Sequence, residues 1–138
     1  MKKYKIAFIC VHNSCRSQIA EALCKYYASD ILESYSAGTA LKDEINKDAV
    51  RLMKELYSID MTINQYSKLL EDIPDVDIVI TMGCNVVCPK VEAKYYKDLG
   101  LKDPTNLGDI EFLKVIKDIE KFILELKANI ITYSNLLI

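Results

Sequence analysis

The stretch YKIAFICVHNSCRSQIAEAL, residues 4–23, runs from a short aliphatic segment through a polar loop into an amphipathic segment. Residues 4–11 are short and mostly apolar, which is typical of a strand buried on both faces of a parallel sheet. From Ser17 onward, apolar side chains recur at helical spacing, and we expect Ser14 or Ser17 to cap that helix. The stretch therefore predicts a strand, a tight loop and a helix in this order.

The middle of the chain repeats this order. Residues 33–37 are typical of a short strand that ends at Gly38, and residues 49–56 place apolar side chains on one face of a second helix. Residues 76–81, with the sequence VDIVIT, are rich in β-branched side chains and predict a central strand.

The last third of the chain predicts a short fourth strand near residues 92–96 and a long amphipathic helix over residues 109–131. Strands that alternate with helices are typical of an α/β fold. We expect residues 1–138 to form a single domain, a doubly wound sheet of about four parallel strands flanked by helices. Ligands in such folds bind at the carboxyl ends of the strands.

The composition is that of a globular protein with reactive thiols. A chain of 138 residues that is 51% hydrophobic can bury one sizeable core. Its 18 basic and 20 acidic residues include no basic tract, so we expect no nucleic acid partner. We recognise no signal peptide and no apolar run of about 20 residues, and expect a cytoplasmic protein without a membrane span. Five cysteines, an odd number, favour reactive thiols or metal ligands over a disulfide framework.

The loop after the first strand carries the clearest functional pattern. Cys10 ends the predicted strand, and Arg16 follows six residues later, near the start of the helix. A loop whose backbone N–H groups point inward at a helix N-terminus forms a concave site for a tetrahedral oxyanion, and an arginine adds a bidentate charged fork. The residues expected to bind the oxyanion are Val11, His12, Asn13, Ser14, Cys15 and Arg16.

The same positive field favours the thiolate form of Cys10, which makes this residue a candidate nucleophile. Ser17 is placed to donate a hydrogen bond to its sulfur. The alternative is structural: Cys10 is a buried residue at the end of a strand, and Arg16 is a solvated helix residue. The strong strand and helix on either side of the loop favour the functional interpretation.

Residues 10–23, CVHNSCRSQIAEAL, resemble the phosphate-binding loop of the low-molecular-weight protein tyrosine phosphatase superfamily. The portion NSCRS is closer to the arsenate reductases of that superfamily than to its phosphatases. The resemblance extends to Ser36-Ala37-Gly38 and Asp103-Pro104 and covers positions 1 to about 130. It implies a thioredoxin-coupled arsenate reductase with a phosphate-binding loop after the first strand.

Two further thiols follow the third predicted strand in the sequence TMGCNVVCP, residues 81–89. Reduction of As(V) to As(III) needs two electrons, which a pair of thiols supplies by forming a disulfide. The resemblance implies that Cys10 attacks arsenate, that Cys84 resolves the adduct, and that Cys88 carries the disulfide outward. The oxidised pair is then reduced by an external dithiol, thioredoxin or a similar protein, without any bound cofactor.

The chain departs from its relatives at three places. His12 stands where many relatives have glycine, and we expect its side chain at the surface of the loop. Many thioredoxin-coupled members separate the last two cysteines by six residues, whereas three lie between Cys84 and Cys88. Some members bind potassium through a threonine and an aspartate in the segment that here reads NQYSK, residues 64–68, where neither is evident. We therefore expect no metal site.

Asp103, followed by Pro104, is placed before the last helix. The resemblance implies that its carboxylic acid protonates the departing oxygen of the substrate. An Asp-Pro pair is also a common turn, and this structural interpretation remains open. The next residues, Thr105 and Asn106, do not supply the aromatic side chain that tyrosine phosphatases commonly place there.

Two other functions fit the same residues. A phosphatase of the superfamily would use Cys10 and water, with Cys84 and Cys88 protecting the nucleophile from over-oxidation. A zinc or thiol-binding module would draw its ligands from Cys10, Cys15, Cys84, Cys88 and His12.

Overall fold

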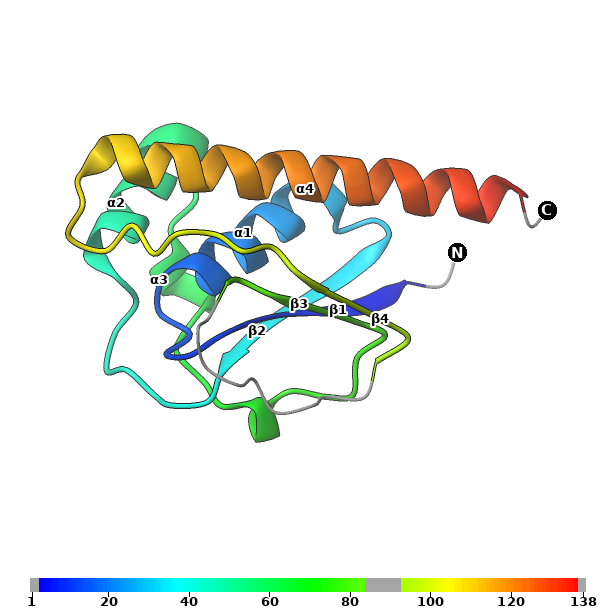
Figure 1. The fold of residues 1–138 in the computed structure, drawn as a ribbon, viewed down its shortest axis with the longest axis horizontal. Helices are drawn as coiled ribbons and strands as arrows, with labels where there is room; N and C mark the ends of the chain where they lie inside the picture. Colours follow the sequence, from blue (N-terminus) through cyan, green and yellow to red (C-terminus); the bar gives the residue numbers. More distant parts are fainter. Residues whose placement is uncertain (1–2, 84–92, 137–138) are drawn as a thin grey trace.

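The computed structural model describes residues 3–83 and 93–136, with side chains up to residue 132. Strands and helices alternate along it (Figure 1). In chain order the elements are β1 (Tyr4–Cys10), α1 (Arg16–Ala28), β2 (Leu32–Gly38), α2 (Lys47–Tyr57), α3 (Met61–Asn64), the 3-10 helix η1 (Leu70–Asp72), β3 (Ile78–Thr81), β4 (Tyr95–Asp98) and α4 (Asp109–Leu136).

The four strands form one parallel sheet in the order β2-β1-β3-β4. The predicted α/β sheet of four parallel strands is confirmed, with shifted boundaries. The fourth strand begins at Tyr95, later than expected, and Glu92 lies outside the described residues. The last helix continues five residues past residue 131, to Leu136.

The strands have different environments on their two faces because successive side chains point to opposite sides. Ile6 and Phe8 point into the larger core cluster, which they share with α1, α2 and α4. Ala7 and Ile9 point the other way, toward a smaller cluster that includes Leu70 from η1. Figure 1 shows the longer helices on one side of the sheet and η1 on the other.

The caps of the helices explain where two of them begin. Asn46 caps α2, because its side-chain Oδ1 accepts hydrogen bonds from the backbone N–H groups of Asp48 and Ala49 at 2.9 and 3.1 Å. The serine cap predicted for α1 is wrong. The N-cap is Cys15, which makes no side-chain cap bond. Ser17 lies inside the first turn, and the N–H groups at this helix end point back toward the preceding loop.

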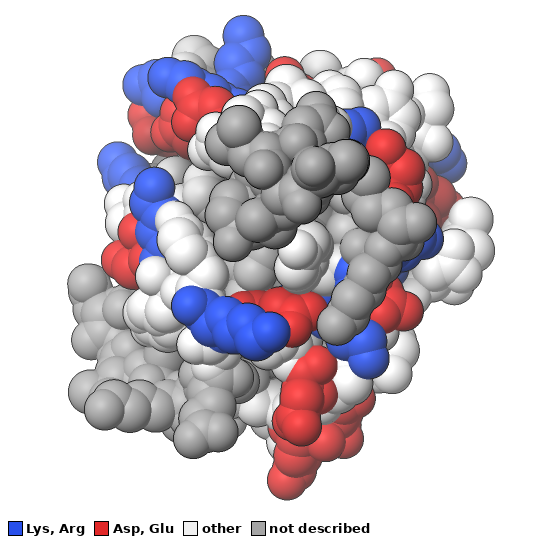
Figure 2. All heavy atoms as spheres, turned by 90° about the vertical axis from the view of Figure 1, so that its right-hand side faces the viewer, with Lys and Arg blue, Asp and Glu red and all other residues white. Residues whose placement is uncertain are grey.

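Helix α4 packs along α1 on the same side of the sheet (Figure 1). Within residues 3–83 and 93–136, no helix combines the length and the apolarity that crossing a bilayer requires. Figure 2 shows the face of the molecule at the amino ends of the strands, where basic and acidic side chains are interspersed.

The strand order places a switch point next to β1. After β1 the chain crosses to β2 on one side, and after β2 it crosses to β3 on the other side. The carboxyl ends of β1 and β3 are joined by a hydrogen bond of 3.1 Å from the Met82 N–H to the Ile9 carbonyl. A crevice at such a switch point is the usual ligand site of an open α/β sheet.

Candidate active site

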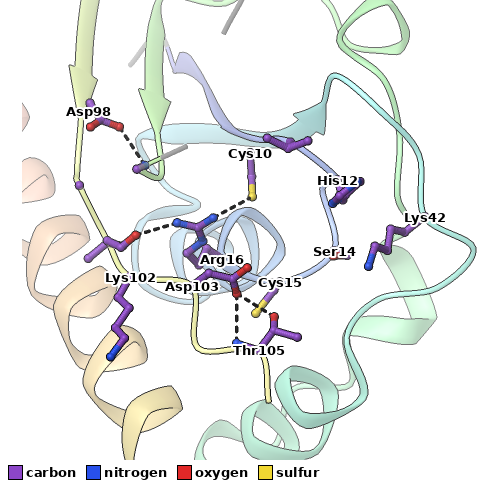
Figure 3. Close-up of a pocket in the computed structure, with 14 residues that line it drawn as sticks. Cys10, His12, Ser14, Cys15, Arg16, Lys42, Asp98, Lys102, Asp103 and Thr105 are labelled. Atoms are coloured by element: carbon purple, nitrogen blue, oxygen red, sulfur yellow. Dashed lines mark hydrogen bonds between the residues drawn. The ribbon is translucent and has the colours of Figure 1, made fainter. Parts of the chain in front are cut away.

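A cavity of about 850 Å³ opens at the carboxyl ends of β1, β3 and β4. It is lined by the loop after β1, by Gly83 after β3, by the segment after β4, and by Lys42. Figure 3 shows Cys10, Arg16 and Asp103 converging there from three segments of the chain. The cavity therefore gathers the nucleophile, the arginine and the acid that the sequence predicts.

The loop after β1 turns its carbonyl groups outward. Four consecutive carbonyls, from Val11 to Ser14, accept hydrogen bonds from groups outside the loop. The donors are Thr39 N–H at 2.8 Å and Ala40 N–H at 2.9 Å to Val11, Ser67 Oγ at 2.8 Å to His12, Gln18 Nε2 at 2.9 Å to Asn13, and Asn46 N–H at 2.8 Å to Ser14.

Outward carbonyls direct the N–H groups of the same peptides inward. The peptide bonds of the loop are trans, so each N–H points opposite to the carbonyl of the residue before it. The N–H groups of residues 12–15 therefore face the centre of the loop, where the N-terminus of α1 adds its positive dipole end. This arrangement suits a tetrahedral oxyanion.

Gly38 allows β2 to pass directly behind the loop. A Cβ atom at this position would lie 2.5 Å from the carbonyl oxygen of Val11 and 2.9 Å from the backbone nitrogen of Asn13. Any side chain would displace the loop, which gives a physical reason for the glycine in the Ser36-Ala37-Gly38 match.

Asn13 fixes the loop from inside. It is fully buried and has a positive φ of 50°, a left-handed conformation that asparagine tolerates well. Its Oδ1 accepts hydrogen bonds from Gln18 Nε2 at 2.9 Å and from the Lys68 N–H at 3.0 Å, and its Nδ2 donates to Ser17 Oγ at 2.9 Å. The Asn13 side chain thus holds the loop, while the backbone around it serves the cavity.

A buried ionic cluster supports this network from below. Glu21 Oε1 accepts a hydrogen bond from Ser36 Oγ at 2.6 Å and lies 3.4 Å from Lys68 Nζ. Its Oε2 pairs with Lys25 Nζ at 2.5 Å. The side chains of Lys68 and Glu21 are only 10% and 4% exposed. The ammonium group of Lys68 is therefore paired with the carboxylate of Glu21 in a largely buried site.

Arg16 is 7% exposed and joins three segments. Its Nη1 donates to the carbonyls of Met82 at 2.8 Å and Leu101 at 2.7 Å, and its Nη2 lies 3.9 Å from Cys10 Sγ. Its Nε is buried and has no hydrogen-bond partner among the described residues. Nη1 is thus occupied by protein, and the edge formed by Nε and Nη2 is the fork that can bind two oxygens of an oxyanion.

Asp103 and Thr105 form a tight turn at the cavity wall. Asp103 Oδ1 accepts hydrogen bonds from the Thr105 hydroxyl at 2.7 Å and from its N–H at 3.1 Å. Burial raises the pKa of Asp103, but the Thr105 bonds and the charges of Arg16 and Lys42 outweigh it, so the pKa lies below its ordinary value. Asp103 is consequently ionised at rest, and an acid role requires it to gain a proton.

Cys15 lines the cavity as a neutral thiol. Burial, together with the negative charge of Asp103, raises the pKa of Cys15 to about 12. Burial likewise raises the pKa of Cys24, in the middle of α1, to about 12. Both thiols are buried, and their high pKa values make them packing residues.

Residues 5–133 match the family of low molecular weight phosphotyrosine protein phosphatases. The chain belongs to this family. An arsenate reductase of Bacillus cereus is 35% identical over 122 residues, which span 85% of this chain and 89% of that protein. A solved arsenate reductase in the phosphate binding state superposes with a TM-score of 0.82 at 30% identity, over 91% of this chain and 98% of that one. A thioredoxin-dependent arsenate reductase of Corynebacterium glutamicum gives a TM-score of 0.74 at 33% identity, over 95% and 63% of the two chains.

The family and the fold that the sequence resemblance implied are therefore confirmed. Among the predicted site residues, Cys10, Val11, His12, Ser14, Cys15, Arg16 and Asp103 all line the cavity. Ser17 is buried beneath it and accepts a hydrogen bond from Asn13. This bond leaves the Ser17 hydroxyl proton free to donate, so its bond to Cys10 stays a prediction. His12 is exposed, as expected for a residue at the loop surface.

Cys84 and Cys88 lie outside the described residues, so their predicted roles are not tested by the geometry. Among the described residues of this protein, no group of three or more His, Cys, Asp or Glu side chains could hold a metal ion. The zinc alternative drew on Cys84 and Cys88 and therefore stays open.

Sequence reasoning missed several residues of the cavity. Lys42 lies after β2, and Asp98 and Lys102 lie at and after the end of β4. Asp98 had a signal that could have found it, because it is a polar residue two positions past the strand predicted near residues 92–96. The Asp-x-Thr spacing of Asp103 and Thr105 was a second signal, since aspartate often accepts a bond from the backbone two residues on.

Proposed function

We propose that this chain reduces arsenate to arsenite with a relay of three thiols, Cys10, Cys84 and Cys88. The observation that carries the proposal is the position of Gly83. It lines the cavity that holds Cys10 and Arg16, and in the sequence it directly precedes Cys84. Because Cys84 is the next residue in the sequence, we expect the chain to bring a second thiol within reach of the oxyanion site, where a phosphatase needs only one. The arsenate reductases among its relatives support this assignment.

In the first step the Cys10 thiolate attacks As(V), and an S–As bond forms as one arsenate oxygen leaves as water. The inward N–H groups of residues 12–15 and the Nε and Nη2 groups of Arg16 bind the remaining oxygens. These donors stand where negative charge develops, so they stabilise the transition state without reorganisation.

Asp103 supplies a proton to the departing oxygen. It is ionised at rest, but an oxyanion bound beside it raises the pKa of a carboxyl group through like-charge repulsion. Protonation of Asp103 and binding of the substrate are therefore coupled, and the acid becomes available when the substrate is in place.

In the second step the Cys84 thiolate attacks the sulfur of Cys10. A disulfide forms between the two cysteines, the S–As bond breaks, and its electron pair goes to arsenic, which leaves as As(III) in arsenite. Cys88 then attacks Cys84 and releases the Cys10 thiolate, and the oxidised pair is Cys84 with Cys88.

An external dithiol restores the pair by becoming a disulfide itself. Thioredoxin is the reductant we propose, in accord with the thioredoxin-dependent relative. The relay needs no bound cofactor, because the protein thiols carry both electrons. A cytoplasmic location supplies the reducing conditions that such thiols need.

The second candidate is a phosphatase, favoured by the family and by the same oxyanion loop. Phosphate and arsenate are both tetrahedral oxyanions, and binding alone does not separate the two reactions. The cavity wall around Asp103 is polar, with Lys102 and Thr105, which suits a free inorganic oxyanion better than the ring of an aryl ester.

The test is arsenite release with thioredoxin, thioredoxin reductase and NADPH, for the wild type and for Cys84→Ser and Cys88→Ser. We expect both variants to lose steady-state arsenate turnover but to keep any hydrolysis of p-nitrophenyl phosphate, which needs only Cys10. Cys24→Ala is the control, because Cys24 lies on α1 within the hydrophobic core. This variant should turn over arsenate like the wild type. Normal turnover by both serine variants would rule out the relay.

A further inference from the structure

One peptide group lies between two opposite charges at the edge of the cavity. The carbonyl of Met82 accepts a hydrogen bond from Arg16 Nη1 at 2.8 Å. The N–H of the same peptide, that of Gly83, donates to Asp98 Oδ1 at 2.8 Å. Figure 3 shows Asp98 on the far side of this segment from Arg16. The guanidinium and the carboxylate are thus connected through a single planar unit.

The carboxylate of Asp98 is itself held in place. Its Oδ1 also accepts a hydrogen bond of 2.7 Å from the hydroxyl of Thr81, which is 3% exposed. The strand pairing of β3 with β4 continues past this point, with the Leu99 N–H donating to the Thr81 carbonyl at 2.9 Å. Asp98 therefore faces the peptide from a fixed position at the end of β4.

The backbone at Gly83 leaves the peptide little freedom. Gly83 has a φ of 92°, and a Cβ atom there would lie 2.5 Å from the backbone nitrogen of Leu101 and 2.7 Å from its carbonyl oxygen. That same Leu101 carbonyl is the second acceptor of Arg16 Nη1, at 2.7 Å. Both carbonyls that accept hydrogen bonds from Arg16, those of Met82 and Leu101, thus belong to closely packed backbone. Asp98 binds the N–H on the opposite side of the Met82 peptide.

We propose that Asp98 is a positioning residue, which orients Arg16 for oxyanion binding through the peptide between Met82 and Gly83. It fixes the direction of this peptide, and its negative charge polarises the peptide so that the Met82 carbonyl becomes a stronger acceptor. With Nη1 held in this way, the Nε and Nη2 edge stays turned toward the loop. The inference deepens the proposed function and rests on Arg16 binding the oxyanion.

The test compares Asp98→Ala with Asp98→Asn, which keeps an acceptor oxygen of the same shape. The matched control is Asp77→Ala. Asp77 Oδ2 accepts a hydrogen bond of 2.9 Å from the Lys5 N–H at the opposite end of β3, away from the cavity. The measurements are the Kd for inorganic phosphate by calorimetry and the rate of Cys10 alkylation by iodoacetamide as a function of pH, in a Cys84→Ser, Cys88→Ser background.

We expect Asp98→Ala to weaken phosphate binding roughly five- to tenfold, less than the direct loss of a charge-assisted hydrogen bond, because Asp98 acts on the oxyanion only through Arg16. Its alkylation profile should shift to higher pH, because a misplaced guanidinium favours the Cys10 thiolate less. Asp98→Asn keeps the acceptor oxygen but loses the charge, so its loss of affinity should be smaller than that of Asp98→Ala, and Asp77→Ala should match the wild type in both measurements.

Wild-type phosphate affinity and an unchanged alkylation profile in folded Asp98→Ala would overturn the proposal, and so would an equal loss in Asp77→Ala. If Asp98→Ala does not fold, Thr81→Val replaces it in the test. This variant removes the hydroxyl that binds Asp98, so it should weaken phosphate binding as well, but to a smaller extent. Failure of the proposed function would give a different result. The wild type would release no arsenite, although its phosphate binding would still be weakened by Asp98→Ala.

Discussion

The guanidinium of Arg16 lies against the sulfur of Cys10, with 3.9 Å between Nη2 and Sγ. Both residues are only 7% exposed, although they are separated by a polar loop of five residues. A permanent positive charge at this distance in a buried site stabilises a thiolate and any oxyanion bound to it. The chemistry proposed for the chain depends on this pair.

Replacement of Arg16 by lysine should lower kcat/KM for arsenate by about 10- to 100-fold. Lysine keeps the charge, but it cannot contact the Met82 and Leu101 carbonyls while it presents a fork to the oxyanion. Each lost charge-assisted bond is worth about 1.5–3 kcal/mol. Steady-state kinetics check this, with Arg51→Lys as control, because Arg51 pairs with Asp109 and Asp48 at an exposed site. Equal kinetics for Arg16→Lys and the wild type would contradict the assigned role.

Native protein should be alkylated at Cys10 but not at Cys15 or Cys24 near neutral pH. Burial raises the pKa of both of the latter thiols to about 12, so they stay protonated and unreactive. Mass spectrometry after brief iodoacetamide treatment checks this in a Cys84→Ser, Cys88→Ser background. Phosphate should protect Cys10, and protein unfolded in urea should react at all three. Modification of native Cys15 as fast as Cys10 would count against this account of the cavity.

Asp103→Asn should reduce kcat by about 10²- to 10⁴-fold, the usual contribution of a general acid. A general acid must carry its proton, so the rate should fall as the pH rises through the pKa of Asp103 in the substrate complex. The amide does not titrate, and this fall should be absent in the variant. The pH dependence of kcat tests the prediction.

Asp109→Asn is the matched control for this measurement. A hydrogen bond from Arg51 lowers the pKa of Asp109, but this carboxylate lies outside the cavity. Its pH profile should equal that of the wild type. A profile for Asp103→Asn that keeps the decline at high pH would assign the titration to another group.

Gly38→Ala should weaken phosphate binding and destabilise the fold by about 1–3 kcal/mol, the usual cost of overpacking. The new methyl group would press on Val11 and Asn13 at the back of the loop. Gly108→Ala is the control, since Gly108 has a φ of 94° and open space around it, so the substitution strains only the backbone. Urea unfolding measures the stability of each variant, and calorimetry measures its phosphate affinity. Normal phosphate affinity in Gly38→Ala would contradict this prediction, because it would show that the loop can shift without loss of oxyanion binding.

The fold could be predicted from the sequence because its signals are local. The β-branched run at residues 76–81 and the helical spacing after Ser17 each depend on neighbours in the chain. The predicted serine cap of α1 failed for a functional reason, since the N–H groups at this helix end face the oxyanion loop. Propensity rules are expected to fail at such sites.

The site was predictable only where its parts are close in sequence. Cys10 and Arg16 fall within one loop, and the resemblance supplied Asp103. The pairing of Arg16 with the carbonyls of Met82 and Leu101 depends on the strand order, which brings together residues 66 and 85 positions apart. The same holds for Lys42, and for the ionised state of Asp103, which depends on Thr105, Arg16 and Lys42.

A single-turnover experiment tests the relay most directly. Fully reduced protein is mixed with excess arsenate in the absence of any external reductant, and arsenite is counted per chain. We predict one arsenite for the wild type and for Cys88→Ser, because Cys10 and Cys84 hold the two electrons required, and none for Cys10→Ser or Cys84→Ser. Stoichiometric arsenite from Cys84→Ser, or none from the wild type, would contradict the account.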